Sequence, residues 1–163
     1  MSNDWGSVTT VAAHLAVATA QPVITLLGDA NVTVEAATTY ADAGATAVDA
    51  LDGNLTTAIV LTGTVELNAT GVRLLRYNVA DAGGTAAVEK VRTVNVVDTT
   101  SPVITLLGDA NATHVINTAW VDPGTTASDT LDGNLSNQVT ISGTVDVNAT
   151  GNYVLTYSVS DGA

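Results

Sequence analysis

The sequence predicts two tandem all-β domains, and three observations support this prediction. The chain repeats with an offset of 80 residues, because 33 of the 62 positions in residues 22–83 are identical to their counterparts in 102–163. Aliphatic residues and Thr are abundant and Phe is absent, a composition typical of strands. No ten-residue window carries the i, i+3, i+4, i+7 apolar stripe of an amphipathic helix. A period of this length indicates two small domains.

Turn residues divide each repeat into short strands. In the first repeat we expect strands at 23–27, 32–36, 58–61 and 72–79, and a last and longest strand at 88–97. Clusters such as Asp42-Ala43-Gly44 and Asp52-Gly53-Asn54 lie between them, and these residue types favour turns. About seven short strands per repeat is the pattern of an immunoglobulin-like (Ig-like) β-sandwich. The chain contains no Cys, so no disulfide supports the domains.

The two repeats end differently. The first continues into TAAVEKVRTVNVVD (residues 85–98), whereas the second stops at Ala163. At the 80-residue offset, the counterpart of this stretch is WGSVTTVAAHLAVA (residues 5–18) near the N-terminus. The sequence therefore predicts an N-terminal donor strand in residues 1–20, a complete sandwich in 21–100, and a second sandwich in 101–163 that lacks its last strand.

Several motifs carry a family resemblance. They are PVITLLG at the start of each repeat, YADAGA (40–45), DALDGNL (49–55), YNVAD (77–81), VDTT (97–100), and WVDPG (120–124) with YVLTY (153–157) in the second repeat. The combination resembles the bacterial Ig-like repeats of surface proteins, of the DUF5011 and HYR-like kind, over residues 21–163. The resemblance implies an extracellular or cell-surface protein without enzymatic activity, because such repeats form stalks, adhesins and appendages.

A missing last strand suggests how the chain assembles. Unpaired backbone groups at an open sheet edge invite a strand from elsewhere. The alternating residues Val11, Ala13, Leu15 and Val17, preceded by Val8, form the candidate polymerisation strand. We expect this strand to enter the second domain of the next copy, between strands near 103–107 and 153–159. Such head-to-tail contacts give a homopolymer, which predicts a structural subunit of an extracellular filament or pilus-like appendage.

Other interpretations of the same segments stay open. A spacer or adhesive module of a larger cell-surface adhesin or stalk would show the same pattern, and a closed or strand-swapped dimer is a third option. Residues 4–21 and 84–101 share only four of 18 identities, so length and register carry the donor-strand hypothesis. Ala18-Thr19-Ala20 has the form of a signal-peptidase site, but the preceding segment carries Asp4 and no Lys or Arg, and His14 interrupts its apolar part.

The charge distribution excludes some partners and suggests one cation. The net charge is −12, from 16 acidic and four basic residues, which argues against nucleic-acid binding. No apolar run reaches the roughly 18 residues of a membrane span. Acidic residues recur at matched turns, and the candidate metal ligands are Asp42, Asp49, Asp52, Asp98, Asp122, Asp129 and Asp132. No cofactor is required, but these oxygen donors would suit Ca²⁺, although plain turns explain the same residues.

Two remaining features concern modification and catalysis. Asn-x-Ser/Thr sequons begin at Asn31, Asn54, Asn68, Asn111, Asn134 and Asn148. They fall in predicted turns, where a glycan would be tolerated. His14 and His114 are the only histidines, and neither belongs to a nucleophile motif, so we do not expect an enzyme.

Overall fold

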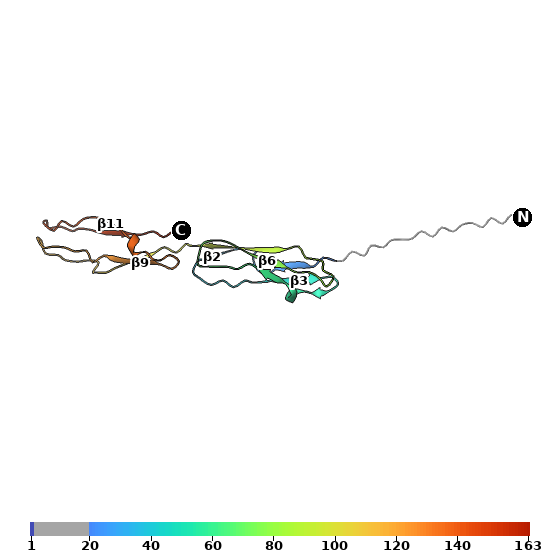
Figure 1. Cartoon of the computed structure of the whole chain (residues 1–163). Helices are drawn as coiled ribbons and strands as arrows, with labels where there is room; N and C mark the ends of the chain where they lie inside the picture. Colours follow the sequence, from blue (N-terminus) through green and yellow to red (C-terminus); the bar gives the residue numbers. More distant parts are fainter. Residues whose placement is uncertain (2–19) are drawn as a thin grey trace.

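The computed structural model describes residue 1 and residues 20–163. Figure 1 shows two elongated β-domains that follow one another end to end. The first contains strands β1 to β7 and the second strands β8 to β12. The described residues contain no α-helix, only the short 3₁₀ turns η1 (Thr56–Ala58) and η2 (Ser136–Gln138). The all-β prediction is confirmed, whereas the predicted donor strand lies outside the described residues.

Two sheets form the first domain. One has the order β1-β3-β4, and the other has the order β2-β7-β6-β5. Their bounds are β1 Val23–Leu26, β2 Asn31–Glu35, β3 Ala45–Asp49, β4 Gly53–Asn54, β5 Val60–Thr62, β6 Gly71–Asn78 and β7 Lys90–Val97. The strand expected at 58–61 begins later, because η1 occupies residues 56–58. β7 begins at Lys90, two residues later than expected, and shares the greatest strand length, eight residues, with β6.

β7 lies in the middle of its sheet. It pairs in parallel with β2, Val94 facing Val32, and antiparallel with β6, Val94 facing Arg73. Its inward residues Arg92, Val94 and Val96 are all at most 1% exposed. Because β7 satisfies the backbone of two neighbours at once, its loss would open the sheet at its centre.

The core of the first domain lies between the two sheets. Ile24 and Ala47 from one sheet meet Leu75 and Tyr77 from the other, and Val79 completes the cluster. Period-two alternation explains the selection, since Leu75 and Tyr77 point inward while Leu74 and Arg76 face solvent. This cluster confirms the sandwich that the strand pattern predicts.

The second domain repeats this plan only in part. β8 (Val103–Leu106), β9 (Thr125–Asp129) and β10 (Gly133–Asn134) form the sheet β10-β9-β8. β11 (Thr140–Ser142) pairs only with β12 (Thr156–Ser158). The counterpart of β2, residues 111–115, forms no strand, and β12 has three residues where β6 has eight. Among the described residues, no strand of the second domain takes the place of β7.

One glycine in each domain allows a close backbone crossing. Gly63 has φ +98°, and a Cβ there would overlap the carbonyl oxygen of Leu74. Gly143 has φ +100° and the same relation to Val154. Both the positive φ and the close approach require glycine, which explains why Gly-Thr-Val occurs in both repeats.

A single carboxylate holds the segment between the domains. Glu35 Oε1 accepts hydrogen bonds from Thr99 N at 2.7 Å, Thr100 N at 3.1 Å and Thr100 Oγ1 at 2.9 Å. Glu35 Oε2 accepts from Thr99 Oγ1 at 2.8 Å. These hydrogen bonds, the backbone bond from Thr99 foremost, lower the pKa of Glu35. The end of β2 thus fixes the path of the chain into the second domain.

Candidate functional site: an open strand position and an acidic domain junction

The position of β7 in the first domain is marked by a buried arginine. The Arg92 guanidinium forms an ion pair with Asp42 and donates to Tyr77 Oη at 3.2 Å. It also donates to the backbone oxygens of Asp29 at 2.9 Å and Gly44 at 3.2 Å, and to that of Leu27. Arg92 is 1% exposed, and a buried charge is tolerated only when it is paired and hydrogen-bonded. We call the acceptors around this guanidinium the arginine socket.

Tyr77 and Asp42 are coupled within the socket. The Tyr77 hydroxyl donates to Asp42 Oδ2 at 2.5 Å. Burial, then the hydrogen bond and charge of Asp42, raise the pKa of Tyr77 to about 12. The pKa of Asp42 is lowered because the hydrogen bonds from Tyr77 and Arg92 and the Arg92 charge outweigh its burial. Asp42 is therefore the anion of the socket, and a metal ion is not needed to explain it.

The second domain keeps the acceptors of this socket. Asp122, Gly124 and Tyr157 stand 80 residues after Asp42, Gly44 and Tyr77. Asp122 Oδ1 accepts from the Tyr157 hydroxyl at 2.7 Å and from Gly124 N at 3.1 Å. In the described residues no donor reaches Asp122 Oδ2, the oxygen that corresponds to the one bound by Arg92. The hydrogen bond to Asp122 raises the pKa of Tyr157, as the corresponding bond does for Tyr77.

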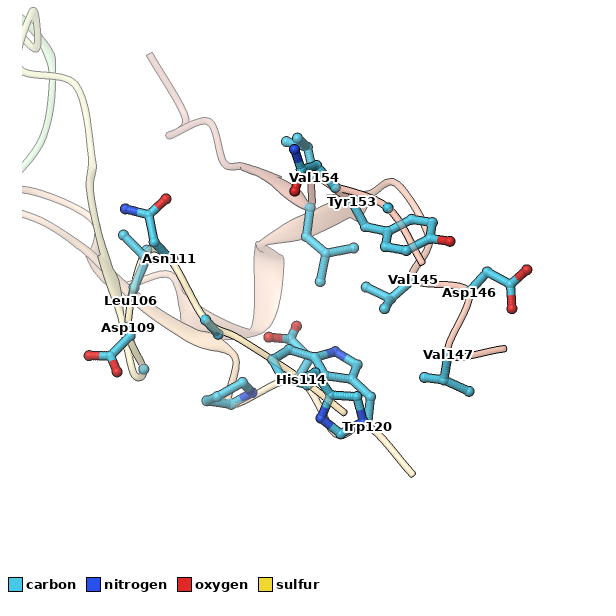
Figure 2. A pocket seen from close by; sticks show the side chains of 18 of the residues that line it. Leu106, Asp109, Asn111, His114, Trp120, Val145, Asp146, Val147, Tyr153 and Val154 are labelled. Atoms are coloured by element: carbon cyan, nitrogen blue, oxygen red, sulfur yellow. The ribbon is translucent and has the colours of Figure 1, made fainter. Parts of the chain in front are cut away.

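An open groove surrounds the second socket. Its volume is about 1170 Å³, and its lining includes Leu106, Trp120, Leu155 and Tyr157. In Figure 2, Asp109 and Asn111 lie on one side of it and Tyr153 and Val154 on the other. Leu155 and Tyr157 are only half-buried, whereas their counterparts Leu75 and Tyr77 are 4% and 2% exposed. The groove is the space that β7 fills in the first domain.

The segments expected to border the groove, near 103–107 and 153–159, both line it, the first through Leu106 and the second through Leu155 and Tyr157. The strand pairing differs from the expectation, because β8 pairs with β9 and belongs to the opposite sheet. The backbone that corresponds to β2 lies at residues 111–115, which are fully exposed. The reason is the parallel pairing of β2 with β7, which places β7 between β2 and β6 rather than beside β1.

Trp120 and His114 make the second socket different from the first. Trp120 stands where the first domain has Tyr40, and its ring meets His114 edge-on with centroids 5.3 Å apart. The Trp120 Nε1 atom is buried without a hydrogen-bond partner. In the first domain the Tyr40 hydroxyl donates to Asp42 at 3.2 Å. The second socket thus has one internal donor fewer than the first.

A second cluster lies where the domains meet. Asp98 follows β7, Asp129 ends β9 and Asp132 lies in the next turn, and one carboxylate oxygen from each falls within 4.8 Å of the others. Asp129 is 8% exposed, and its Oδ1 accepts from Leu131 N at 2.7 Å and Asp132 N at 3.1 Å. The Oδ2 atoms of Asp129 and Asp98 are buried without partners. Burial, and then the negative charges of Asp129, Asp161 and Glu35, raise the pKa of Asp98.

The other predicted residues separate into two groups. Of the seven candidate metal ligands, Asp42 and Asp122 belong to the arginine sockets, and only Asp98, Asp129 and Asp132 converge in the described residues. Asp49 makes the same turn as Asp129, with Oδ1 bonded to Leu51 N and Asp52 N. All six sequon asparagines are exposed. The polymerisation strand (Val8 to Val17) lies outside the described residues.

The sequence analysis missed the role of Arg92. The signal was available, because Arg92 is a charged residue within a strand whose neighbours alternate with Val. An arginine inside an apolar alternation indicates a buried acidic partner, and Asp42, in a turn whose aspartate recurs as Asp122 in the second repeat, is the matching acid. We assigned that aspartate to a cation site instead.

The structural comparisons find partial similarity. The chain is 21% identical to a lipoprotein of Bacteroides thetaiotaomicron, with a TM-score of 0.43 over 52% of this chain and 45% of that one. It is 25% identical to a structure of the CBM51-2 domain, in complex with GlcNAc, and INT domains of Clostridium perfringens ZmpB, with a TM-score of 0.39 over 55% and 21% of the two chains. A structure of the M60 catalytic domain with both CBM51 domains of ZmpB is 23% identical, with a TM-score of 0.40 over 57% and 10%. The chain spans less than half the length of each.

Sequence comparison gives a clearer result. No curated protein matches the chain. No described helix is long and apolar enough to cross a membrane. The family model described as bacterial surface protein, Ig-like domain, matches residues 24–96 and again residues 104–163. This match covers both repeats and supports cell-surface modules, while the narrower DUF5011 or HYR-like assignment stays a prediction. The chain belongs to the family of bacterial surface protein Ig-like domains.

Proposed function

We propose that the chain is a spacer segment of a larger cell-surface adhesin or stalk protein. The observation that carries the proposal is the junction: two family domains stand end to end, and Glu35 holds Thr99 and Thr100 between them. A linker held by four hydrogen bonds transmits direction from one domain to the next. A spacer needs this property in order to extend from a surface.

The described residues show no cluster of side chains that points to catalysis. The groove of the second domain is wide and open, and the other side-chain clusters are turns, sockets and the acidic junction. No Ser-His-Asp or Cys-His arrangement lies among the described residues. An adhesive role would need a ligand, which the proposal does not assign.

The runner-up is a filament subunit that polymerises by strand donation. The open groove favours it, because a sheet without its central strand accepts another. The composition of the proposed donor weighs against it. Residues 2–19 contain no Arg or Lys, whereas the second domain keeps the acceptors of an arginine.

Light scattering after size-exclusion chromatography, combined with negative-stain microscopy, separates the two functions. The full chain, a deletion of residues 2–18 and the variants Leu15→Asp and Val17→Asp would be compared. If the chain is a spacer, every sample should be an extended monomer, with a molar mass equal to that of one chain. Filaments in the full chain that disappear in the deletion and in both substitutions would overturn it in favour of the strand-donation function.

A further inference from the structure

The first domain shows what the groove of the second domain is built to hold. Arg92 satisfies five acceptors there, and Val94 and Val96 on the same face of β7 are 0% and 1% exposed. An arginine followed by two aliphatic residues at period two is thus the inward face of the strand that occupies this position in the first domain.

The second domain retains the complementary charge. Asp122 has one carboxylate oxygen bonded to Tyr157 and Gly124 N, and its other oxygen has no donor among the described residues. The backbone oxygen of Gly124 accepts from Leu107 N at 3.0 Å, as that of Gly44 does from Leu27 N at 2.9 Å, and so keeps a lone pair directed as in the first socket. The second domain contains no Lys or Arg to pair with this site, because all four of them lie in the first.

We propose that the groove binds an extended strand with an arginine whose guanidinium pairs with Asp122. The strand runs antiparallel to β12 and parallel to residues 111–115, as β7 does between β6 and β2. Its arginine donates to Asp122 Oδ2 and Tyr157 Oη, and the next two inward residues lie opposite Tyr153 and Gly151, as Val94 and Val96 lie opposite Arg73 and Gly71. Charge-assisted bonds in a water-excluded groove then select the strand, while backbone pairing provides sequence-independent affinity. This inference does not depend on the spacer function.

A peptide titration tests the arginine directly. The full chain, labelled with ¹⁵N, is titrated with a peptide of residues 85–98, with a matched R92M peptide and with a peptide of residues 5–18. The indole signal of Trp120 reports on the groove. We expect the arginine peptide to bind at least about tenfold more tightly than the other two, the factor set by hydrogen bonds to a charged group.

Matched variants of the chain complete the test. Asp122→Asn should lower the affinity for the arginine peptide and leave that for the R92M peptide nearly unchanged, whereas Glu66→Gln, an exposed acid of the first domain, should change neither. Equal affinities for the arginine and R92M peptides would overturn the proposal. So would binding of residues 5–18 as tight as that of the arginine peptide, or no binding of any peptide.

The acidic junction carries a second, independent proposal. Asp129 and Asp98 each have a buried Oδ2 atom without a partner, and one carboxylate oxygen of each lies within 4.8 Å of the other and of an oxygen of the exposed Asp132. Two unpaired carboxylates held together repel each other unless a proton or a cation lies between them. We propose that a divalent cation of the Ca²⁺ type binds Asp98, Asp129 and Asp132. Ca²⁺ accepts irregular sets of carboxylate oxygens, and this cation would join the end of the first domain to the second.

Isothermal titration of the chelator-treated full chain with Ca²⁺ tests the cation site. Asp98→Asn removes a ligand without changing the Asp129 turn. Asp49→Asn is the matched control: Asp49 forms the same turn in the first domain, but the residue 80 positions before Asp98 is Ala18, which has no carboxylate. We expect saturable binding of one Ca²⁺ that Asp98→Asn weakens at least tenfold and Asp49→Asn leaves unchanged. No saturable binding, or equal weakening by both substitutions, would refute the site.

Discussion

Arg92 and Asp42 form a buried ion pair that ties the last strand of the first domain to the loop before β3. The pair spans 50 residues of sequence and joins β7, an interior strand of one sheet, to the loop before β3 of the other sheet. In the second domain Asp122 keeps the place of Asp42 and has no arginine among the described residues. The two domains therefore show the same socket filled and open.

The first prediction concerns the filled socket. Arg92→Met should destabilise the first domain by about 3–5 kcal/mol, because it leaves the Asp42 carboxylate buried without its cation. Urea unfolding followed by NMR signals of the first domain measures the loss. Arg76→Met is the control: Arg76 forms an exposed ion pair with Glu89 at 2.6 Å, so its loss should cost under about 1 kcal/mol. Equal effects would contradict the socket.

A second prediction follows from Tyr77. Its pKa in the folded domain is about 12, above the ordinary value of 10.0. Because burial and Asp42 favour the neutral phenol, the stability it contributes is fully present below pH 10 and is lost as the pH rises through 12. Urea unfolding of the first domain at pH 8 to 12 should show this decline, and Tyr77→Phe should reduce it. A decline that is the same in both proteins would rule out Tyr77 as its source.

The linker clamp gives a third prediction, also dependent on pH. The pKa of Glu35 is lowered by its bonds to Thr99 and Thr100, so this contribution is present above the ordinary pKa of 4.5 and is lost as the pH falls through the lower folded value. Glu35→Gln at neutral pH should loosen the linker, seen as broader interdomain distances in small-angle scattering and faster tumbling of each domain. Glu66→Gln should leave both unchanged. Unaltered scattering for Glu35→Gln would show that the clamp does not orient the domains.

Glycine 63 provides a fourth prediction that separates two causes of strain. Gly63 and Gly84 both have positive φ, +98° and +86°, but only at Gly63 would a Cβ overlap a backbone oxygen. Gly63→Ala should therefore destabilise the first domain by several kcal/mol, and Gly84→Ala by about 1–2 kcal/mol. Thermal unfolding of the two variants measures the difference. Similar losses would mean that the backbone at Gly63 shifts to accept the methyl group.

Local sequence patterns predicted most of the fold, whereas the features that depend on pairing between distant segments were not predicted. Alternation in residues 72–79 predicted β6, because it depends only on neighbouring residues. β3 was not among the predicted strands, and β4 lies within the turn expected at Asp52-Gly53-Asn54. The neighbour of the β7 position was predicted wrongly on one side, because the parallel pairing of β2 with β7 joins segments about 60 residues apart and no local pattern encodes it. The convergence of Asp98 with Asp129 depends on domain packing in the same way. The role of Arg92 was not predicted because the residue was counted only toward the net charge, and its place within an apolar alternation was not used to predict that its side chain is buried.

An open strand position in the second domain should be visible in amide hydrogen exchange of the full chain, measured alone and with the peptide of residues 85–98. We expect rapid exchange in residues 111–115 and 151–158 of the free chain and slower exchange in both segments with the peptide, but not with its R92M form. Unchanged exchange in these segments, or equal protection by both peptides, would contradict this expectation.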